Sequence, residues 1–130
     1  MHNINSPASH DEGIEHRLAK SPAPRVSLAD LEHNILSANY FTAMQGVHGA
    51  AGCPGIVSAV PTKSPLDLLT ICVLVLRNGF TVVGTSACAS PANFDAQIGR
   101  ELAFADAKRQ MWPLMGFHLK QQLHTGDDYK

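Results

Sequence analysis

The Asn78-Gly79 dipeptide constrains the fold more than any other feature, because it lies between two runs of β-forming residues. The first run covers residues 66–76 and the second covers residues 81–86. Asn-Gly between such runs is the strongest short signal for a β-hairpin, since a type I′ turn needs positive φ at both central residues. The sequence therefore predicts a hairpin with a two-residue loop.

The first strand of this hairpin has apolar side chains on both faces, which predicts a central strand covered on both sides. With the two-residue loop, the expected cross-strand pairs are Arg77 with Phe80, Val75 with Val82 and Leu74 with Val83. Gly84 then lies opposite Val73 and leaves room for another backbone or a ligand. A chain of 130 residues is short, which leaves one of the two faces of this strand available for a second subunit to cover.

An amphipathic helix is predicted after the hairpin. Ser90-Pro91 supplies an N-cap followed by proline at the first helical position, and Pro113 is expected to end the helix. The helix has an apolar stripe formed by Phe94, Ile98, Leu102, Ala105 and Trp112. It also has a track of small residues that permits close packing, formed by Gly99, Ala103 and Ala107. The fold class predicted is α+β, an antiparallel sheet built around the hairpin with the helix packed on it, in an oligomer.

The rest of the chain divides by composition. Residues 1–26 are expected to be a disordered N-terminal arm, residues 27–123 a single ligand-binding domain and residues 124–130 a polar tail. Within the domain we expect a short helix over 28–38, a strand over 39–44 and an additional edge strand at 117–119. Residues 46–65 are rich in Gly and Pro and lack the Gly-Lys-Ser/Thr ending of a phosphate-binding P-loop. A flexible or partner-contacting loop is expected there.

The charge and cysteine content exclude several classes of protein. The formal net charge is −1 with seven histidines counted neutral, whereas a duplex DNA or RNA binder shows a basic stripe. Three cysteines without Cys-x-x-Cys spacing, and the lack of an apolar secretory segment near Met1, indicate a reducing compartment. The longest apolar run is too short to span a bilayer. We expect a cytoplasmic protein of the host cell with no membrane and no DNA partner.

No catalytic motif is present in the sequence. Gly-x-Ser-x-Gly and His-Glu-x-x-His are absent, and no carboxylate pair marks a cleft. By their chemistry, Cys88 and His118 could act as nucleophile and base, but nothing in the sequence brings them together. No two metal-ligating side chains have a suitable spacing. We expect no enzymatic activity, no metal and no cofactor.

The residues that remain are suited to binding a small anion. Residues 86–90 lead into a helix N-terminus, where free amides favour a phosphate. The candidate ligand-binding residues are Arg77, Phe80, Ser86, Ser90, Asn93, Arg100 and Arg109. Arginine with an aromatic ring can hold an adenine and its phosphates. The alternative is that Asn93 only caps the helix locally and that the arginines pair with Asp95, Glu101 or Asp106.

The chain resembles a family of small phage proteins that includes the type-one Thoeris anti-defence proteins, most specifically in the second half of the matching segment. The resemblance covers residues 27–122 and rests on this spaced series: Thr70-Ile71-Cys72-Val73-Leu74, Asn78-Gly79-Phe80-Thr81-Val82, Gly84, Ser86-Ala87-Cys88, Asn93-Phe94-Asp95, Ile98-Gly99-Arg100, Ala103, Ala107, Trp112-Pro113-Leu114 and Gly116. It implies a sponge that holds cyclic ADP-ribose isomers made by TIR-domain enzymes without cleaving them. It also implies ligand pockets between subunits of a homo-oligomer (a dimer or a multiple of dimers) and, in some members, separate sites for cyclic di- or trinucleotides.

Three hypotheses follow from the sequence. The first is a sequestering binder of a cyclic nucleotide, the second is an enzyme that processes such a nucleotide, and the third is a phage regulatory or structural protein that binds a host protein. The lack of a catalytic motif disfavours the second. The resemblance favours the first over the third.

Overall fold

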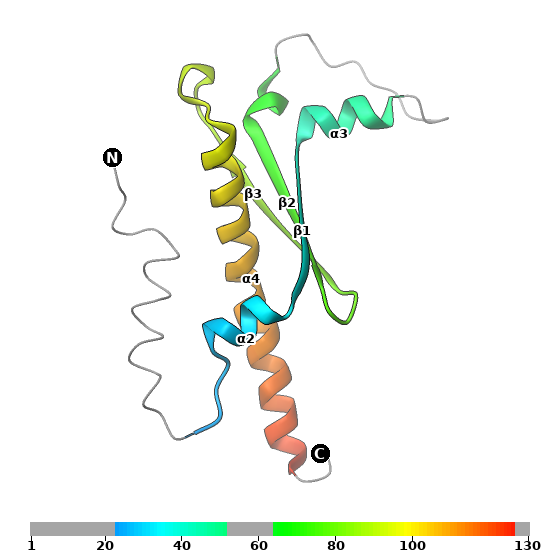
Figure 1. Cartoon of the computed structure of the whole chain (residues 1–130), viewed down its shortest axis with the longest axis vertical. Coiled ribbons are helices and arrows are strands. Elements are labelled where there is room, and N and C mark those ends of the chain that lie inside the picture. Colours follow the sequence, from blue (N-terminus) through cyan, green and yellow to red (C-terminus); the bar gives the residue numbers. More distant parts are fainter. Residues whose placement is uncertain (1–22, 52–63, 127–130) are drawn as a thin grey trace.

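A computed structural model describes residues 23–51 and 64–126 of the chain. Its centre is an antiparallel sheet of three strands in the order β1-β2-β3 (β1, Ile35–Thr42; β2, Leu69–Leu76; β3, Thr81–Ala87). The long helix α4 (Ala96–Thr125) lies across one face of this sheet (Figure 1). The predicted α+β class, the hairpin and the helix are confirmed, and β2 is the central strand as expected.

The region before β2 differs from the prediction. Helix α2 (Leu28–His33) begins at a capping box between Ser27 and Asp30, in which Ser27 N donates to Asp30 Oδ2 (2.9 Å) and Asp30 N to Ser27 Oγ (3.0 Å). It ends at His33 rather than at residue 38. The residues that follow pair with β2 over the whole length of β1, and aromatic and branched side chains favour this extended backbone.

The predicted loop at 46–65 begins as a helix. Helix α3 (Ala43–Ala50) starts at a second capping box, between Thr42 and Gln45, and carries Gly46 and Gly49 within it. A reciprocal box satisfies two otherwise free N–H groups, which offsets the low helix propensity of the two glycines. Residues 52–63 lie outside the described part, as do residues 1–22 of the predicted arm and residues 127–130 of the predicted tail. A 3₁₀ turn, η1 (Pro65–Leu68), precedes β2.

The hairpin loop is one residue longer than predicted. Gly79 N donates to Leu76 O (2.9 Å) and Leu76 N to Phe80 O (2.8 Å). In the described chain only glycines have positive φ, so Asn78 does not, while Gly79 has φ +89°. A type I turn followed by a left-handed glycine makes a three-residue loop. The register therefore shifts by one, so that Val75 pairs with Thr81, Leu74 with Val82 and Cys72 with Gly84.

The shifted register turns Gly84 toward α4. A Cβ at Gly84 would collide with the carbonyl oxygen of Ala103 and the backbone nitrogen of Ala107. The predicted close approach at Gly84 and the small-residue track on the helix are therefore confirmed, and they meet each other. The core around this contact contains these buried residues: Leu31, Cys72, Leu74, Leu76, Val82, Ala103, Ala107 and Met111.

In residues 23–51 and 64–126 the second face of the sheet is open over most of its length, and α3 reaches only its end, where Gly46 lies against the Phe41 ring. Along β2 the side chains alternate between buried and half-buried. The buried set faces α4, and the half-buried set is Leu69, Ile71, Val73 and Val75. The sequence predicts that both faces of β2 are covered, and α4 covers one of them.

Helix α4 continues past Pro113 to Thr125, so Pro113 does not end the helix and residues 117–119 do not form a strand. Pro113 and Arg109 are both exposed, so the Arg109 carbonyl that the proline leaves unpaired can bind water. A helix of 30 residues is about 45 Å long, whereas a strand of eight residues spans about 27 Å. The C-terminal part of α4 therefore extends beyond the sheet (Figure 1).

We expect Gly84→Ala to lower the free energy of unfolding by about 3 kcal/mol, because the added methyl meets helix backbone that cannot move aside. Urea unfolding followed by circular dichroism measures this change. Gly116→Ala is the matched control, since a Cβ there has no atom within 4 Å. It should stabilise α4 by about 1 kcal/mol. A Gly84→Ala protein as stable as the wild type would contradict the close helix–sheet contact.

Candidate functional site

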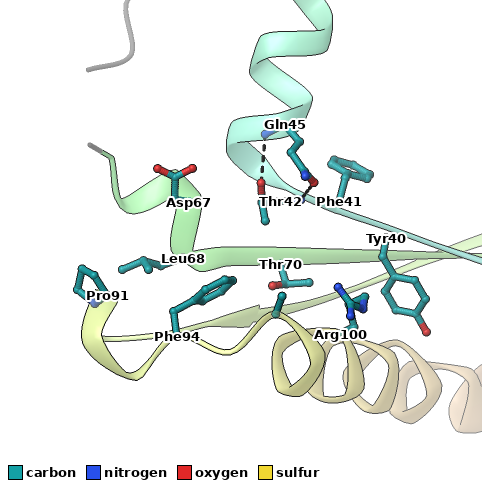
Figure 2. Close-up of a pocket in the computed structure, with 11 residues that line it drawn as sticks. Tyr40, Phe41, Thr42, Gln45, Asp67, Leu68, Thr70, Pro91, Phe94 and Arg100 are labelled. Carbon is teal, nitrogen blue, oxygen red and sulfur yellow. Dashed lines mark hydrogen bonds between the residues drawn. The ribbon is translucent and has the colours of Figure 1, made fainter. Parts of the chain in front are cut away.

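Two adjoining cavities lie where α4 begins. The larger, of about 600 Å³, is bounded by β1, α3, η1 and the first turns of α4 (Figure 2). The smaller, of about 250 Å³, lies between the end of β3, the 3₁₀ turn η2 (Pro91–Asn93) and the same turns of α4. Both are lined by Leu68, Thr70 and Phe94. The two cavities therefore meet at these three residues.

Among the residues that the structure describes, Arg100 is the one cation that lines the larger cavity. It lies beside Tyr40 (Figure 2) and is half-buried, and its Nη2 donates to Gln97 Oε1 (2.9 Å). The rings of Tyr40 and Phe94 line the same space. Arginine with aromatic faces provides a phosphate partner and a surface on which a base can stack. Asp67 also lines this cavity, so an anionic group would be favoured at the Arg100 end.

The α3 capping box forms another wall of the larger cavity. Gln45 N donates to Thr42 Oγ1 (3.1 Å) and Thr42 N donates to Gln45 Oε1 (2.9 Å), as Figure 2 shows. These atoms are already paired, so the side-chain amide nitrogen of Gln45 is the polar group that this wall can offer a ligand.

The smaller cavity contains Ser86 and Asn93 from the predicted set. Asp95, rather than Ser90, caps α4: its Oδ1 accepts from Gln97 N (2.9 Å) and Ile98 N (3.1 Å). Ser90 caps only the short turn η2 and makes no side-chain cap hydrogen bond. The expectation of free amides for a phosphate at this helix N-terminus is therefore wrong, because a carboxylate occupies them and would repel an anion.

The structure divides the seven predicted residues among three places. Ser86, Asn93 and Arg100 line the two adjoining cavities, and Ser90 accepts the Asn93 N–H at their margin (3.1 Å). Arg77 and Phe80 line a separate groove of about 750 Å³ at the hairpin turn. The length of β2 separates this groove from the cavities, about 23 Å at the rise of a strand. A single clamp that contains all seven is not formed within one chain.

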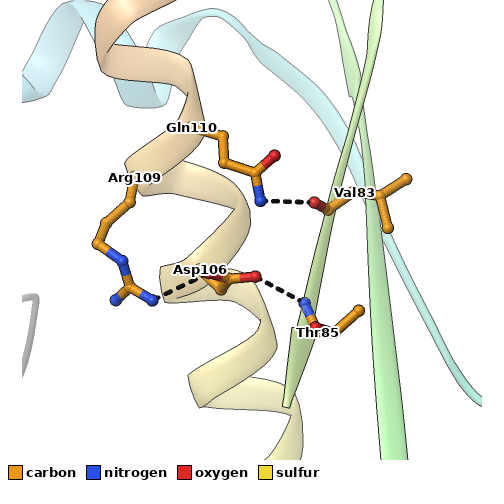
Figure 3. Close-up of polar contacts among 5 residues, drawn as sticks. All are labelled: Val83, Thr85, Asp106, Arg109 and Gln110. Atoms are coloured by element: carbon orange, nitrogen blue, oxygen red, sulfur yellow. Dashed lines mark hydrogen bonds and ion pairs between the residues drawn. The ribbon is translucent and has the colours of Figure 1, made fainter.

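Arg109 follows the alternative that the sequence left open. Its Nη2 pairs with Asp106 Oδ1 at 3.0 Å on the exposed side of α4 (Figure 3). The candidate pair of Cys88 and His118 is not brought together either. Cys88 lines the smaller cavity, where its Sγ donates to Ser90 O, whereas His118 lines the groove at the hairpin turn.

Tyr40 and Thr70 line the larger cavity but were not among the predicted site residues. Tyr40 lies in the predicted strand, but the face to which it points depends on its pairing with Cys72, which no local pattern specifies. Thr70 was visible as a polar residue at the start of an apolar strand, and it is 3% exposed. Phe94 was assigned to the apolar stripe of the helix, whereas it lies just before α4 and lines both cavities.

Burial raises the pKa of both the Tyr40 phenol and the Cys72 thiol. Cys72 contributes further to the raised pKa of Tyr40, while Arg100 acts in the opposite direction. Both groups are therefore neutral at physiological pH. The Tyr40 hydroxyl and the Cys72 thiol share a side-chain hydrogen bond, so it is the ring of Tyr40 that is offered to the larger cavity.

The described residues offer neither a metal-ligating cluster nor a membrane-spanning helix. Among residues 23–51 and 64–126, no group of three or more His, Cys, Asp or Glu side chains could hold a metal ion. In the same residues, no helix has the length and apolarity needed to cross a membrane.

The raised pKa values predict a loss of stability in alkali. A group whose pKa is higher in the folded than in the unfolded chain contributes stability that is full below its unfolded pKa and lost as the pH rises. The ordinary values are 9.0 for Cys72 and 10.0 for Tyr40. We expect the free energy of unfolding, measured in urea, to fall above pH 9, with a smaller slope in Cys72→Ala. Cys88→Ala, which removes a thiol outside the core, is the control. Equal slopes in Cys72→Ala and wild type would contradict the assignment.

Comparison with known proteins gives one match. The model of the phage protein (N4 Gp49/phage Sf6 gene 66) family matches residues 26–123, which contain the sheet, both cavities and most of α4. Neither the curated proteins nor the solved structures give a significant match. Since the matched segment is well over half of the 130 residues, the chain belongs to the phage protein (N4 Gp49/phage Sf6 gene 66) family.

Proposed function

We propose that this phage-family protein is an anti-defence sponge. It binds a cyclic ADP-ribose signal made by a TIR-domain enzyme, holds it without cleaving it in the host cytoplasm, and so blocks Thoeris-type immunity. The observation that carries this proposal is the larger cavity, in which Arg100 lies beside Tyr40 and is the one cation among the described lining residues. The resemblance of residues 27–122 to the type-one Thoeris anti-defence proteins gives the ligand class.

The volume and chemistry of the site are suitable for this ligand. A cavity of about 600 Å³ lies within the range of roughly 300–1,000 Å³ usual for small-ligand pockets. In our proposal Arg100 binds a phosphate and the rings of Tyr40 and Phe94 stack on the base. Ser86 and Asn93 bind hydroxyl or base-edge atoms from the adjoining cavity.

The groove at the hairpin turn has a separate role in the proposal. Arg77 and Phe80 lie there with His118, too far from Arg100 to share a ligand within one chain. We propose that they contact ligand across a subunit boundary of a homo-oligomer. A cyclic di- or trinucleotide is the candidate for a second class of pocket.

A heat-release experiment tests the proposal. Purified protein is incubated with TIR-produced signal, freed of unbound ligand and denatured, and the released molecule is identified by mass spectrometry. A sponge returns the signal intact. Recovery of no ligand would overturn the proposal, and recovery of an altered molecule would identify an enzyme. A pull-down that captures a specific host protein, together with no ligand release, would favour the phage regulatory or structural alternative.

Substitutions test the residue roles. We expect Arg100→Ala to raise the Kd for the signal by about 10- to 100-fold, because a charge-assisted hydrogen bond contributes roughly 1.5–3 kcal/mol. Asn93→Ala, which removes a neutral partner, should raise it by about 3- to 10-fold. Calorimetric titration measures both.

The matched control is Arg109→Ala, on the same helix, because the Arg109 guanidinium pairs with Asp106 outside the cavities. It should change the Kd by less than about threefold, and circular dichroism should show all three variants folded. A normal Kd in both Arg100→Ala and Asn93→Ala would refute the site.

A further inference from the structure

The two edges of the sheet differ in whether side chains bond to their outward backbone groups. At the β3 edge, side chains from α4 occupy the outward backbone groups: Asp106 Oδ2 accepts from Thr85 N (2.9 Å), and Gln110 Nε2 donates to Val83 O (2.8 Å) (Figure 3). An unpaired edge is a template for another strand. These two hydrogen bonds block the middle of β3 to such pairing.

In the part of the chain that the structure describes, no side chain protects the β1 edge in this way. The backbone N–H and C=O groups of Val83 and Thr85 point away from β2, so those of their partners Val73 and Ile71 point toward β1. There they pair with the backbone groups of Asn39 and Phe41. The alternate residues Ala38 and Tyr40 therefore direct their N–H and C=O groups outward. Within residues 23–51 and 64–126, the structure gives these outward groups no partner.

The residues of β1 also lack the usual protective features of an edge strand. Ile35–Thr42 reads ILSANYFT and contains no charged residue and no proline. Leu36 is 58% exposed and Tyr40 is 39% exposed. Lysine, proline or an inward charge is the common protection against edge pairing, so this strand is suited to receive another.

We propose that β1 pairs antiparallel with β1 of a second copy of this chain, about a two-fold axis at Asn39. In this register Ala38 lies opposite the partner's Tyr40 and exchanges both backbone hydrogen bonds with it, and symmetry doubles the set to four. This is the one two-fold register in which Ala38 and Tyr40 satisfy each other's outward groups, so it needs neither Leu36, which lies in the bulge of β1, nor Thr42 N, which donates to Gln45.

The side chains are self-complementary in this register. On the α4 face, the large Tyr40 meets the small Ala38 of the partner. On the open face, Phe41 meets Ser37 of the partner, and the two Asn39 residues face each other. Small opposite large is the arrangement in which cross-strand pairs fit without crowding. This match of β1 to itself selects a second copy rather than an unrelated strand.

Pairing at β1 joins the two sheets into one of six strands with both α4 helices on one face. It also places the partner's Leu36 beside Thr42, a lining residue of the larger cavity. The interface therefore borders the candidate site, although the proposal does not depend on the ligand that occupies it.

Cysteine cross-linking tests the register in the full chain with Cys53 and Cys88 replaced by Ser. In Asn39→Cys the two thiols face each other at a non-hydrogen-bonded pair, about 4.5 Å between Cα atoms, which is within disulfide range. We expect most of the protein to run as a covalent dimer on non-reducing gels after mild oxidation. Ser37→Cys is the matched control, because its thiols are separated by four residues, about 13 Å along the strand, and it should stay monomeric on the gel.

Light scattering tests the interface itself. We expect a mass of twice the 13.9 kDa of the chain, or an even multiple of it, and a fall to half that value in Ala38→Pro. Proline there removes only an outward N–H, so the β1–β2 ladder remains, and Ala38→Ser should behave as wild type. A monomeric wild type, or an oligomer in which Asn39→Cys does not cross-link, would overturn the proposal. Should Ala38→Pro fail to fold, the Asn39→Cys result decides alone.

Discussion

The close approach of α4 to the hairpin is the contact on which the rest of this structure depends. Gly84 has no side chain, so the backbone at Ala103 and Ala107 can lie almost directly on β3. Gly99 does the same at the start of α4, where a Cβ would press against Thr70 Oγ1 (2.6 Å). Contacts at two glycines on different elements fix the position of α4 along the sheet as well as its distance from it.

The hairpin loop decides whether this contact can form. Side chains alternate between the two faces of a strand, so a shift of one residue moves every side chain of β3 to the other face. With a two-residue loop Gly84 would lie opposite Val73, on the open side of the sheet. The three-residue loop with Gly79 at positive φ places it opposite Cys72, under the helix. Local turn chemistry therefore determines the long-range packing.

Much of this fold was predictable because its signals are local. Asn78-Gly79 marked the hairpin, the doubly apolar β2 marked a central strand, and spacing of four residues marked the small-residue track on α4. The features that were not predicted depend on distant partners. Pairing with β2 extends β1 back to Ile35 at the expense of the first helix, and exposure to water allows α4 to pass Pro113.

The candidate site shows the same division. Ser86, Asn93 and Arg100 are close in sequence to one strand–helix junction, so grouping them required no knowledge of the fold. Tyr40 comes close to Arg100 only because β1 pairs with β2 in this register. In that pairing Tyr40 lies opposite Cys72, which is more than thirty residues away in the sequence. Arg77 and Phe80 were grouped with Arg100 by chemistry alone, and the length of the hairpin separates them.

The position of the larger cavity connects ligand binding with assembly. Its Tyr40 wall belongs to β1, the edge strand in which the outward groups of Ala38 and Tyr40 have no partner among the described residues. At the opposite edge of the sheet, Asp106 and Gln110 from α4 bond to β3. The helix that supplies Arg100 to the cavity therefore also leaves β1 as the edge at which another strand can add. A partner at β1 would narrow the side of the cavity that one chain leaves open. Since slower ligand escape is what a sequestering protein requires, assembly at this edge would improve the proposed function directly.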